Sequence, residues 1–180
     1  MILLDGRVRV AAGDITRQAT DAVVNAANST LTGGGGVDGA IHRAGVPRIL
    51  EECLEIRRTL YPEGLPTGEA VITTGGLLPA RYVIHTVGPV WGSEGGREAE
   101  LLAACYRNSL ALASARNLAS VAFPSISTGA FGYPREEAAA VASAAISEFL
   151  GGSDAPAEVH LVFFSRDDID VFLRNHKFGN

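Results

Sequence analysis

The sequence predicts an α/β fold, a three-layer α/β/α sandwich around a mixed, mostly parallel sheet. Two observations lead to this prediction. Short apolar segments typical of buried strands alternate with longer segments whose apolar residues recur at helical spacing. Two strand-like segments follow each other directly only near residues 69–87, which indicates that the sheet is mixed and not purely parallel.

The six predicted strands are short segments rich in apolar residues. They are expected, in order, at residues 7–12, 21–25, 69–74, 82–87, 120–124 and 159–164. The first alternates polar and apolar side chains, as an edge strand does. The second is almost entirely apolar, which is typical of a strand buried in the middle of a sheet. Pro124 ends the fifth.

Five helices are predicted between and after these strands. They are expected, in order, at residues 37–44, 48–60, 97–116, 134–150 and 167–176. Asp14 or Thr16 can also cap a short helix after the first strand. Pro47 and Pro134 open the second and fourth helices, a position that proline tolerates. The third is rich in alanine and leucine, which are among the strongest helix formers.

Composition narrows the classes of protein to which this chain can belong. Its 180 residues, 47% of them hydrophobic, are expected to form one domain over residues 1–180. The net charge of −5 argues against a protein built to bind a nucleic-acid backbone. No apolar run approaches the roughly 18 residues of a membrane span, and residues 1–5 do not resemble a secretory signal. We therefore expect a cytoplasmic protein that does not enter a membrane, with Cys53 and Cys105 as buried thiols and not a disulfide.

The most informative stretch runs from Asn25 to His42, from the end of a buried strand into a helix. It contains four consecutive glycines, Gly33–Gly36. Glycine loses much backbone entropy on folding and buries no side chain, so four in a row indicate a place where bare backbone is useful. A loop of N–H groups around an anion at a helix N-terminus is such a place. Asn28 and Asp38, on either side of the glycines, can hold and activate a water.

A second glycine-containing loop, residues 125–133, follows the strand at 120–124 and precedes another helix. In sheets of this type, ligands bind at the carboxyl ends of the strands. The two loops can therefore face each other across one crevice, and two loops suited to phosphate suit a diphosphate. Together they predict a pocket for a phosphorylated ligand, with a hydrolytic role for the polar residues beside it.

The glycines also fit other phosphate-binding patterns in part. Gly34, Gly36 and Gly39 match the G-x-G-x-x-G of dinucleotide-binding folds. That motif follows its strand immediately, whereas several polar residues intervene here, so a redox dinucleotide fold is the less favoured alternative. A P-loop is excluded, since no lysine follows the glycines.

Four motifs, in order, resemble the macrodomain family and specifically its MacroD-type branch. They are Gly13-Asp14-Ile15-Thr16, Asn25-Ala26-Ala27-Asn28, the stretch Gly33–His42, and the stretch Ser127–Pro134. The resemblance spans nearly the whole chain and implies ADP-ribose binding. It also implies hydrolysis of ADP-ribosyl esters, namely removal of mono-ADP-ribose from Glu or Asp of proteins and deacetylation of O-acetyl-ADP-ribose. The expected partners are therefore ADP-ribose, ADP-ribosylated proteins or O-acetyl-ADP-ribose, and we expect a monomer without a cofactor.

The resemblance also implies roles for individual residues. Asp14 would bind the adenine amino group, with Ile15 beside it, unless Asp14 only caps a helix. Asn28 and Asp38 would hold the distal ribose and a catalytic water, unless they are a turn residue and a helix cap. Phe164 is a candidate for stacking on adenine, although it is also an ordinary strand residue. The remaining contacts, to the distal ribose and the diphosphate, would come from Gly35, Gly36, Val37, Ser127, Thr128, Gly129, Ala130 and Phe131.

Two histidines, His42 and His85, lie in a predicted helix and a predicted strand. His42 lies one helical turn after Asp38, so the two can share a helix face. Together they could then act as a general base in catalysis. We favour the other interpretation, in which His42 packs the helix and steadies the loop. His85 lies in an apolar strand. No His/Cys cluster has the spacing of a zinc site, and no carboxylate cluster suggests a bound metal.

The resulting hypothesis is a metal-independent hydrolysis. The two glycine loops fix the diphosphate, Asn28 orients the distal ribose, and Asp38 positions or deprotonates a water, with a substrate phosphate as the alternative base. An ordinary aspartate has a pKa of about 4, so positioning is expected to contribute more than proton abstraction. Two alternatives stay open, a non-catalytic ADP-ribose reader and an ADP-ribose 1″-phosphate phosphatase. The intact glycine run with Asn28 and Asp38 favours the enzyme, since a reader could lack these residues.

Overall fold

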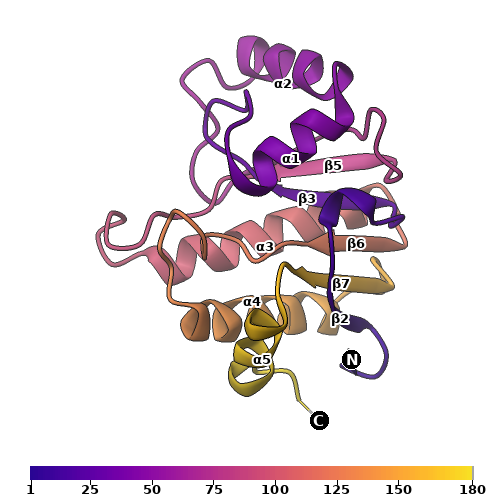
Figure 1. The fold of residues 1–180 in the computed structure, drawn as a ribbon, viewed down its shortest axis with the longest axis vertical. Helices are drawn as coiled ribbons and strands as arrows, with labels where there is room; N and C mark the ends of the chain where they lie inside the picture. The colour runs from indigo at the N-terminus through magenta and orange to yellow at the C-terminus, as the bar shows by residue number, and fades with distance from the viewer. Residues whose placement is uncertain (180) are drawn as a thin grey trace.

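The computed structural model describes residues 1–179 and contains a seven-stranded sheet with helices on both faces (Figure 1). The strands are β1 Ile2–Leu3, β2 Val8–Ala12, β3 Ala22–Ala26, β4 Ala70–Thr74, β5 Tyr82–Thr86, β6 Ser120–Phe123 and β7 Glu158–Phe163. The helices are α1 Gly36–Gly45, α2 Arg48–Thr59, α3 Glu98–Ala115, α4 Arg135–Gly151 and α5 Arg166–Asn175, with a short 3₁₀ helix η1 at Ile15–Arg17. The predicted α/β sandwich is therefore confirmed.

The strand order is β1-β2-β7-β6-β3-β5-β4. Every neighbouring pair from β2 to β5 is parallel, whereas β1 and β4 are antiparallel to β2 and β5. The sheet is thus mixed and mostly parallel, as predicted, and β4–β5 is the antiparallel pair that the sequence indicated. The expectation of an edge strand at residues 7–12 is wrong, because β1 pairs with the outer side of β2. The alternation has another cause, since β2 buries Val8 and Val10 and leaves Arg9 exposed on its other face.

Two apolar cores lie on the two faces of the sheet. Alternation along each strand sends Val23 of β3 to one core and Val24 to the other. Cys53 of α2 belongs to the first core, which α1 and α2 cover, and Cys105 of α3 belongs to the second, to which α4 and α5 contribute. Both thiols are buried and free, as predicted.

The sheet places the two glycine-containing loops side by side. β3 and β6 are parallel neighbours, so their carboxyl ends lie at the same edge. Residues 27–35 lead from β3 into α1, and residues 124–134 lead from β6 into α4. Among residues 1–179, no helix has the length and apolar character that a membrane crossing requires.

Candidate functional site

Two adjoining hollows lie at this edge of the sheet. One, of about 300 Å³, lies between the loops at 27–35 and 124–134 and contains Asp38 in its wall; we call it the Asp38 hollow. The other, of about 720 Å³, lies between η1, α1 and the end of β7; we call it the Asp14 hollow. The two share Gly36, Val37, Ser125 and Gly129, so they form one elongated cleft.

Every site residue predicted from the sequence lines one of the two hollows. The Asp38 hollow takes Asn28, Gly35, Gly36, Val37, Asp38, Ser127, Gly129, Ala130 and Phe131. The Asp14 hollow takes Asp14, Ile15, Gly36, Val37, Thr128, Gly129 and Phe164. Sequence reasoning missed Gly88 and Ser125 in the first, and Arg43 and Asp168 in the second. Gly88 lies just beyond β5, the neighbour of β3, and that position could have indicated it.

The N-terminus of α1 borders both hollows. Its N-cap, Gly35, makes no side-chain hydrogen bond, so N–H groups of the first turn lack a side-chain cap. These N–H groups and the positive end of the helix dipole favour an anion. Gly33 and Gly36 have φ of +90° and +56°, a region that favours glycine. The glycine run thus supplies the bare backbone that the sequence suggested.

Asn28 and Asp38 meet across the glycine run. The Asn28 Nδ2 donates to Asp38 Oδ2 at 3.4 Å. A Cβ on Gly34 would lie 2.7 Å from Asn28 Nδ2 and 3.3 Å from Asp38 Oδ2, so a glycine there lets the two side chains approach. Asp38 is only 3% exposed, whereas Asn28 is open to solvent. In the wall of the hollow, the carboxylate is therefore buried and the amide is exposed.

The other carboxylate oxygen of Asp38 faces inward. The Asn25 Nδ2 donates to Asp38 Oδ1 at 2.8 Å. The His42 Nε2 lies 3.4 Å from the same oxygen but makes no hydrogen bond with it. The His42 ring lies under the glycine run, where a Cβ on Gly33 would be 3.3 Å from its Cγ, and it lines neither hollow. This placement agrees with His42 as a residue that packs the helix and steadies the loop.

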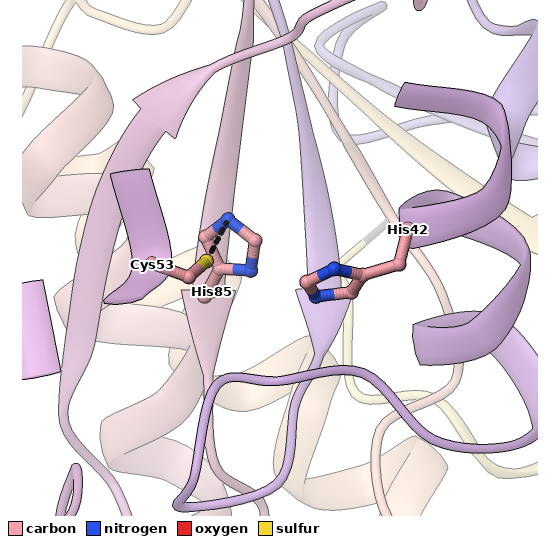
Figure 2. Close-up of side chains that lie close together, drawn as sticks. All are labelled: His42, Cys53 and His85. Carbon is pink, nitrogen blue, oxygen red and sulfur yellow. Dashed lines mark hydrogen bonds between the residues drawn. The ribbon is translucent and has the colours of Figure 1, made fainter. Parts of the chain in front are cut away.

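His42, Cys53 and His85 form a buried cluster that the sequence spacing did not indicate, because they come from α1, α2 and β5 (Figure 2). One potential ligand atom of each lies within 4.8 Å of the others. The Cys53 Sγ lies 3.7 Å from His85 Nε2, as the dashed line in Figure 2 shows. Burial, with a smaller contribution from His42, lowers the pKa of His85 to about 3, so its ring is neutral. Burial, with Asp38 and Glu52 adding to it, raises the pKa of Cys53 to about 12.

Hydrogen bonds around His85 decide whether this cluster suits a metal ion. The Asn25 Nδ2 lies 3.1 Å from His85 Nδ1. Because an amide nitrogen donates hydrogen bonds and does not accept them, His85 Nδ1 is the acceptor of this bond. The proton of the neutral ring is then on Nε2, which lies 2.9 Å from Thr73 Oγ1. The Thr73 hydroxyl in turn donates to the Thr74 carbonyl. The nitrogen that faces Cys53 thus has no lone pair for a metal, and the donor set does not fit one.

The loop at residues 124–134 is held largely by its own hydrogen bonds. Tyr133 N donates to Ser127 O at 2.9 Å, and the Thr128 hydroxyl donates to Ser125 Oγ at 2.8 Å. Ser127 has φ of +65°, and its buried Oγ has no partner among the described residues. A Cβ on Gly88 would clash with that Oγ. The strained Ser127 and the close approach of Gly88 therefore set the shape of this wall.

The Asp14 hollow presents a carboxylate and an aromatic ring. Asp14 caps η1, with Oδ1 accepting from Thr16 N at 2.9 Å and from Thr16 Oγ1 at 2.6 Å. These hydrogen bonds lower the pKa of Asp14, and its Oδ2 lies 3.8 Å from Arg17 Nε. The predicted cap is therefore confirmed. Phe164 follows β7 and is 96% exposed, so its interpretation as an ordinary buried strand residue is wrong.

This chain is similar to known proteins in both sequence and fold. A family model described as Macro domain matches residues 24–142. A Macro domain-containing protein of Methanosarcina mazei is 57% identical over 162 residues, covering 89% of this chain and 83% of the relative. The O-acetyl-ADP-ribose deacetylase of Escherichia coli strain K12 is 49% identical over 168 residues, covering 93% of this chain and 94% of the relative.

A solved structure shares both sequence and fold with this chain. It is the Oceanobacillus iheyensis macrodomain with ADP, at a TM-score of 0.89 and 50% identity, covering 92% of this chain and 87% of that one. A mutant of the same macrodomain with ADPR gives a TM-score of 0.89 and 48% identity, covering 92% of this chain and 89% of that one.

Proposed function

The chain belongs to the Macro domain family, and from this premise we propose that it binds ADP-ribose in the cleft and hydrolyses the ester of O-acetyl-ADP-ribose. The E. coli relative is named for that activity, and a structural neighbour is described with ADPR. The hydrolytic part of the proposal depends on one observation. Asn28 and Asp38 meet in the wall of a hollow that also borders the N-terminus of α1.

The cleft has a suitable arrangement for the three parts of ADP-ribose. The diphosphate would lie where the two hollows join, against N–H groups of Gly36 and Val37 and the loop at residues 125–131. A diphosphate needs no cluster of cations here, because the backbone and the helix dipole favour it. The loop residues Ser127, Thr128, Gly129, Ala130 and Phe131 would wrap it, with Phe131 over the distal ribose.

The adenine would occupy the Asp14 hollow. The Asp14 carboxylate, whose lowered pKa keeps it ionised, would accept a hydrogen bond from the adenine amino group. Ile15 would pack beside the base, and the exposed Phe164 ring would stack on it. The distal ribose would then lie in the Asp38 hollow, with its hydroxyls near the Asn28 amide.

The mechanism follows from this pose. Asp38, held by hydrogen bonds from Asn25 and Asn28, would position a water against the ester carbonyl carbon. The water oxygen forms the new bond to the acyl carbon, the bond from that carbon to the ribose oxygen breaks, and the ribose oxygen takes up a proton. The products are acetate and ADP-ribose. The proton that the water loses passes to Asp38 or to a substrate phosphate.

A second substrate of the same chemistry is the ester between ADP-ribose and a Glu or Asp of a modified protein. Asn28, Gly35, Gly129 and Ala130 line the Asp38 hollow and are exposed, so an acyl group larger than acetyl has room to extend into solvent. This openness favours protein de-ADP-ribosylation as an additional activity.

The proposal is tested by incubating the protein with O-acetyl-ADP-ribose and, separately, with a protein carrying Glu-linked mono-ADP-ribose. We expect release of acetate in the first case and of free ADP-ribose in the second. Calorimetric binding of ADP-ribose without release of either product would contradict the hydrolytic function and favour a reader. Phosphate release from ADP-ribose 1″-phosphate, without acetate release from the ester, would favour the phosphatase instead.

A further inference from the structure

We propose that Asn25, which lies behind the cleft, positions the Asp38 carboxylate, and that His85 and Thr73 hold Asn25 in its working orientation. The proposal rests on the proposed function, since Asp38 is the residue assigned to the water. Asn25, His85 and Thr73 line neither hollow, so all three act through Asp38 and are positioning residues.

The sheet register places the three residues in one layer. Asn25 of β3 is paired directly with His85 of β5, and β5 is paired with β4, which carries Thr73. Strand alternation puts them on the face that α1 and α2 cover, alongside Val23 and Val83. Asn25 and His85 are 0% exposed and Thr73 is 4% exposed. Three polar side chains thus lie together in a buried layer, where polar groups are stabilised only by partners.

The hydrogen bonds run outward from the Asn25 amide group, to Asp38 on one side and to His85 on the other. Asn25 donates one amide hydrogen to Asp38 Oδ1 at 2.8 Å and the other to His85 Nδ1 at 3.1 Å. The opposite ring nitrogen, Nε2, then carries the proton and donates to Thr73 Oγ1 at 2.9 Å. The Thr73 hydroxyl donates to the Thr74 carbonyl at 3.0 Å. Each donor therefore meets an acceptor, and this sequence of bonds fixes the tautomer of His85.

The unpaired oxygen of Asn25 supports this orientation. Asn25 Oδ1 is buried and has no partner among the described residues. Turning the amide over would bring that oxygen against Asp38 Oδ1, leaving two acceptors without a hydrogen between them whichever nitrogen of His85 carries the proton. The orientation with one unpaired oxygen is thus the more stable of the two.

The two oxygens of Asp38 are held unequally. Oδ1 accepts a short hydrogen bond from a buried donor, whereas Oδ2 accepts only a long one, 3.4 Å, from the exposed Asn28. The hydrogen bond from Asn25 therefore fixes the plane of the carboxylate, and Oδ2 stays available to bind the water and the substrate. Without Asn25 the carboxylate can rotate, and fewer molecules hold the water in line for attack.

The first test compares Asn25→Ala with Asn108→Ala. Asn108 is a matched control, because it also donates a side-chain hydrogen bond, to Gly68 O, but from α3 on the far side of the sheet. We expect Asn25→Ala to lower kcat for O-acetyl-ADP-ribose by at least about ten-fold, with ADP-ribose affinity within about two-fold of the wild type. Asn108→Ala should leave both unchanged. An unchanged kcat in Asn25→Ala, or a parallel loss of affinity, would overturn the proposal.

The second test uses Thr73, because Asn25→Ala also removes a buried side chain and can unfold the protein. Thr73→Val keeps the shape and removes the acceptor of His85 Nε2–H, whereas Thr73→Ser keeps the hydroxyl. We expect the valine variant to lower kcat about three-fold and the serine variant to recover it, with ADP-ribose affinity unchanged in both. Equal kcat in the two variants would contradict the role of Thr73.

A third measurement separates this proposal from the proposed function. Long-range ¹H–¹⁵N NMR of the ligand-free protein reports which nitrogen of His85 carries the proton, whatever the substrate. We expect the proton on Nε2 in the wild type and a mixture in Thr73→Val. A proton on Nδ1 would overturn the proposal while leaving hydrolysis intact. Absence of hydrolysis by the wild type would instead contradict the proposed function. The orientation of Asn25 would then be tested only by which His85 nitrogen carries the proton in the NMR measurement.

Discussion

The loop at residues 27–35 and the loop at 124–134 leave neighbouring strands and face the same hollow, but they are built differently. The first, with the start of α1, brings Asn28 and Asp38 together and is supported from behind by the buried polar residues Asn25 and His85. The second contributes backbone and small side chains, and hydrogen bonds within the loop hold its shape.

This difference separates two tasks of the cleft. Side chains that can act on a bond need fixed orientations, and the buried layer behind the first loop supplies them. In the proposed function the diphosphate would lie against the second loop, which contributes backbone and small side chains to the hollow. Changes near the first loop should therefore lower the rate, and changes near the second should lower the affinity.

The largest effect is expected for Asp38→Ala. It should lower turnover of O-acetyl-ADP-ribose by about 100- to 1000-fold, which corresponds to about 3–4 kcal/mol, while ADP-ribose still binds. The measurements are acetate release and calorimetric affinity. Asp170→Ala, at an exposed aspartate of α5, is the control and should behave as the wild type. Full activity of Asp38→Ala would remove Asp38 from the mechanism.

Acid should weaken the layer behind the first loop. Burial lowers the pKa of His85 from 6.5 to about 3, so between these values the unfolded chain binds a proton that the folded chain does not. The contribution of the neutral His85 to the free energy of unfolding is therefore fully present above pH 6.5. It is lost as the pH falls from 6.5 toward about 3. This histidine should remove about 2 kcal/mol from the free energy of unfolding between pH 7 and pH 5.

Urea unfolding at pH 7, 6 and 5 measures this effect. His85→Asn removes the ring, and its free energy of unfolding should depend less steeply on pH over the same range. The same pH dependence in the two proteins would show that His85 is not the group responsible.

A smaller effect, on affinity and not on rate, is expected for Gly88→Ala. The new Cβ would clash with Ser127 Oγ and Ile126 Cγ2, so the second loop must shift. We expect ADP-ribose affinity to fall about ten-fold, which is about 1.4 kcal/mol, with kcat at saturation changed by less than about three-fold. Gly151→Ala, where a Cβ meets no atom within 4 Å, is the control. A loss of kcat without a loss of affinity would erase the distinction between the loops.

The smallest effect is expected at the far end of the cleft. Phe164→Ala should weaken ADP-ribose binding by about 1 kcal/mol through lost stacking. It should change the free energy of unfolding by less than about 0.5 kcal/mol, because the ring is 96% exposed. The adjacent Phe163→Ala, at a buried ring, should instead destabilise the fold by about 3 kcal/mol. Unchanged affinity in Phe164→Ala would exclude the ring from adenine binding.

Much of the fold could be predicted because local signals agreed with it. Helices α3 and α4 and the central strands lie within a residue or two of their predicted bounds, since alanine-rich segments and short apolar runs point to one structure. Strand β1, of two residues, carries no periodicity of its own. Its pairing with β2 is a tertiary contact, so the sequence offered no sign that residues 7–12 would not be an edge.

The cleft could be predicted further than the layer behind it. Asp14, Asn28, Asp38 and Phe164 lie near loops or strand ends, where sequence motifs are local. Thr73 and His85 lie on the consecutive strands β4 and β5, but Asn25 is 60 residues from His85, and only the sheet register brings it to them. An asparagine and a histidine in apolar strands were the available signal, because such residues need partners when buried.

The two cysteines give this molecule a pair of built-in reporters. Cys53 and Cys105 lie in the two cores on opposite faces of the sheet, and burial raises their pKa values to about 12 and about 11. The closed protein therefore presents almost no thiolate at neutral pH, and a thiol reagent reacts only when a layer opens. The labelling rate of Cys53 thus measures how often the layer that supports Asp38 opens. The labelling rate of Cys105 measures the opening of the layer on the other face of the sheet.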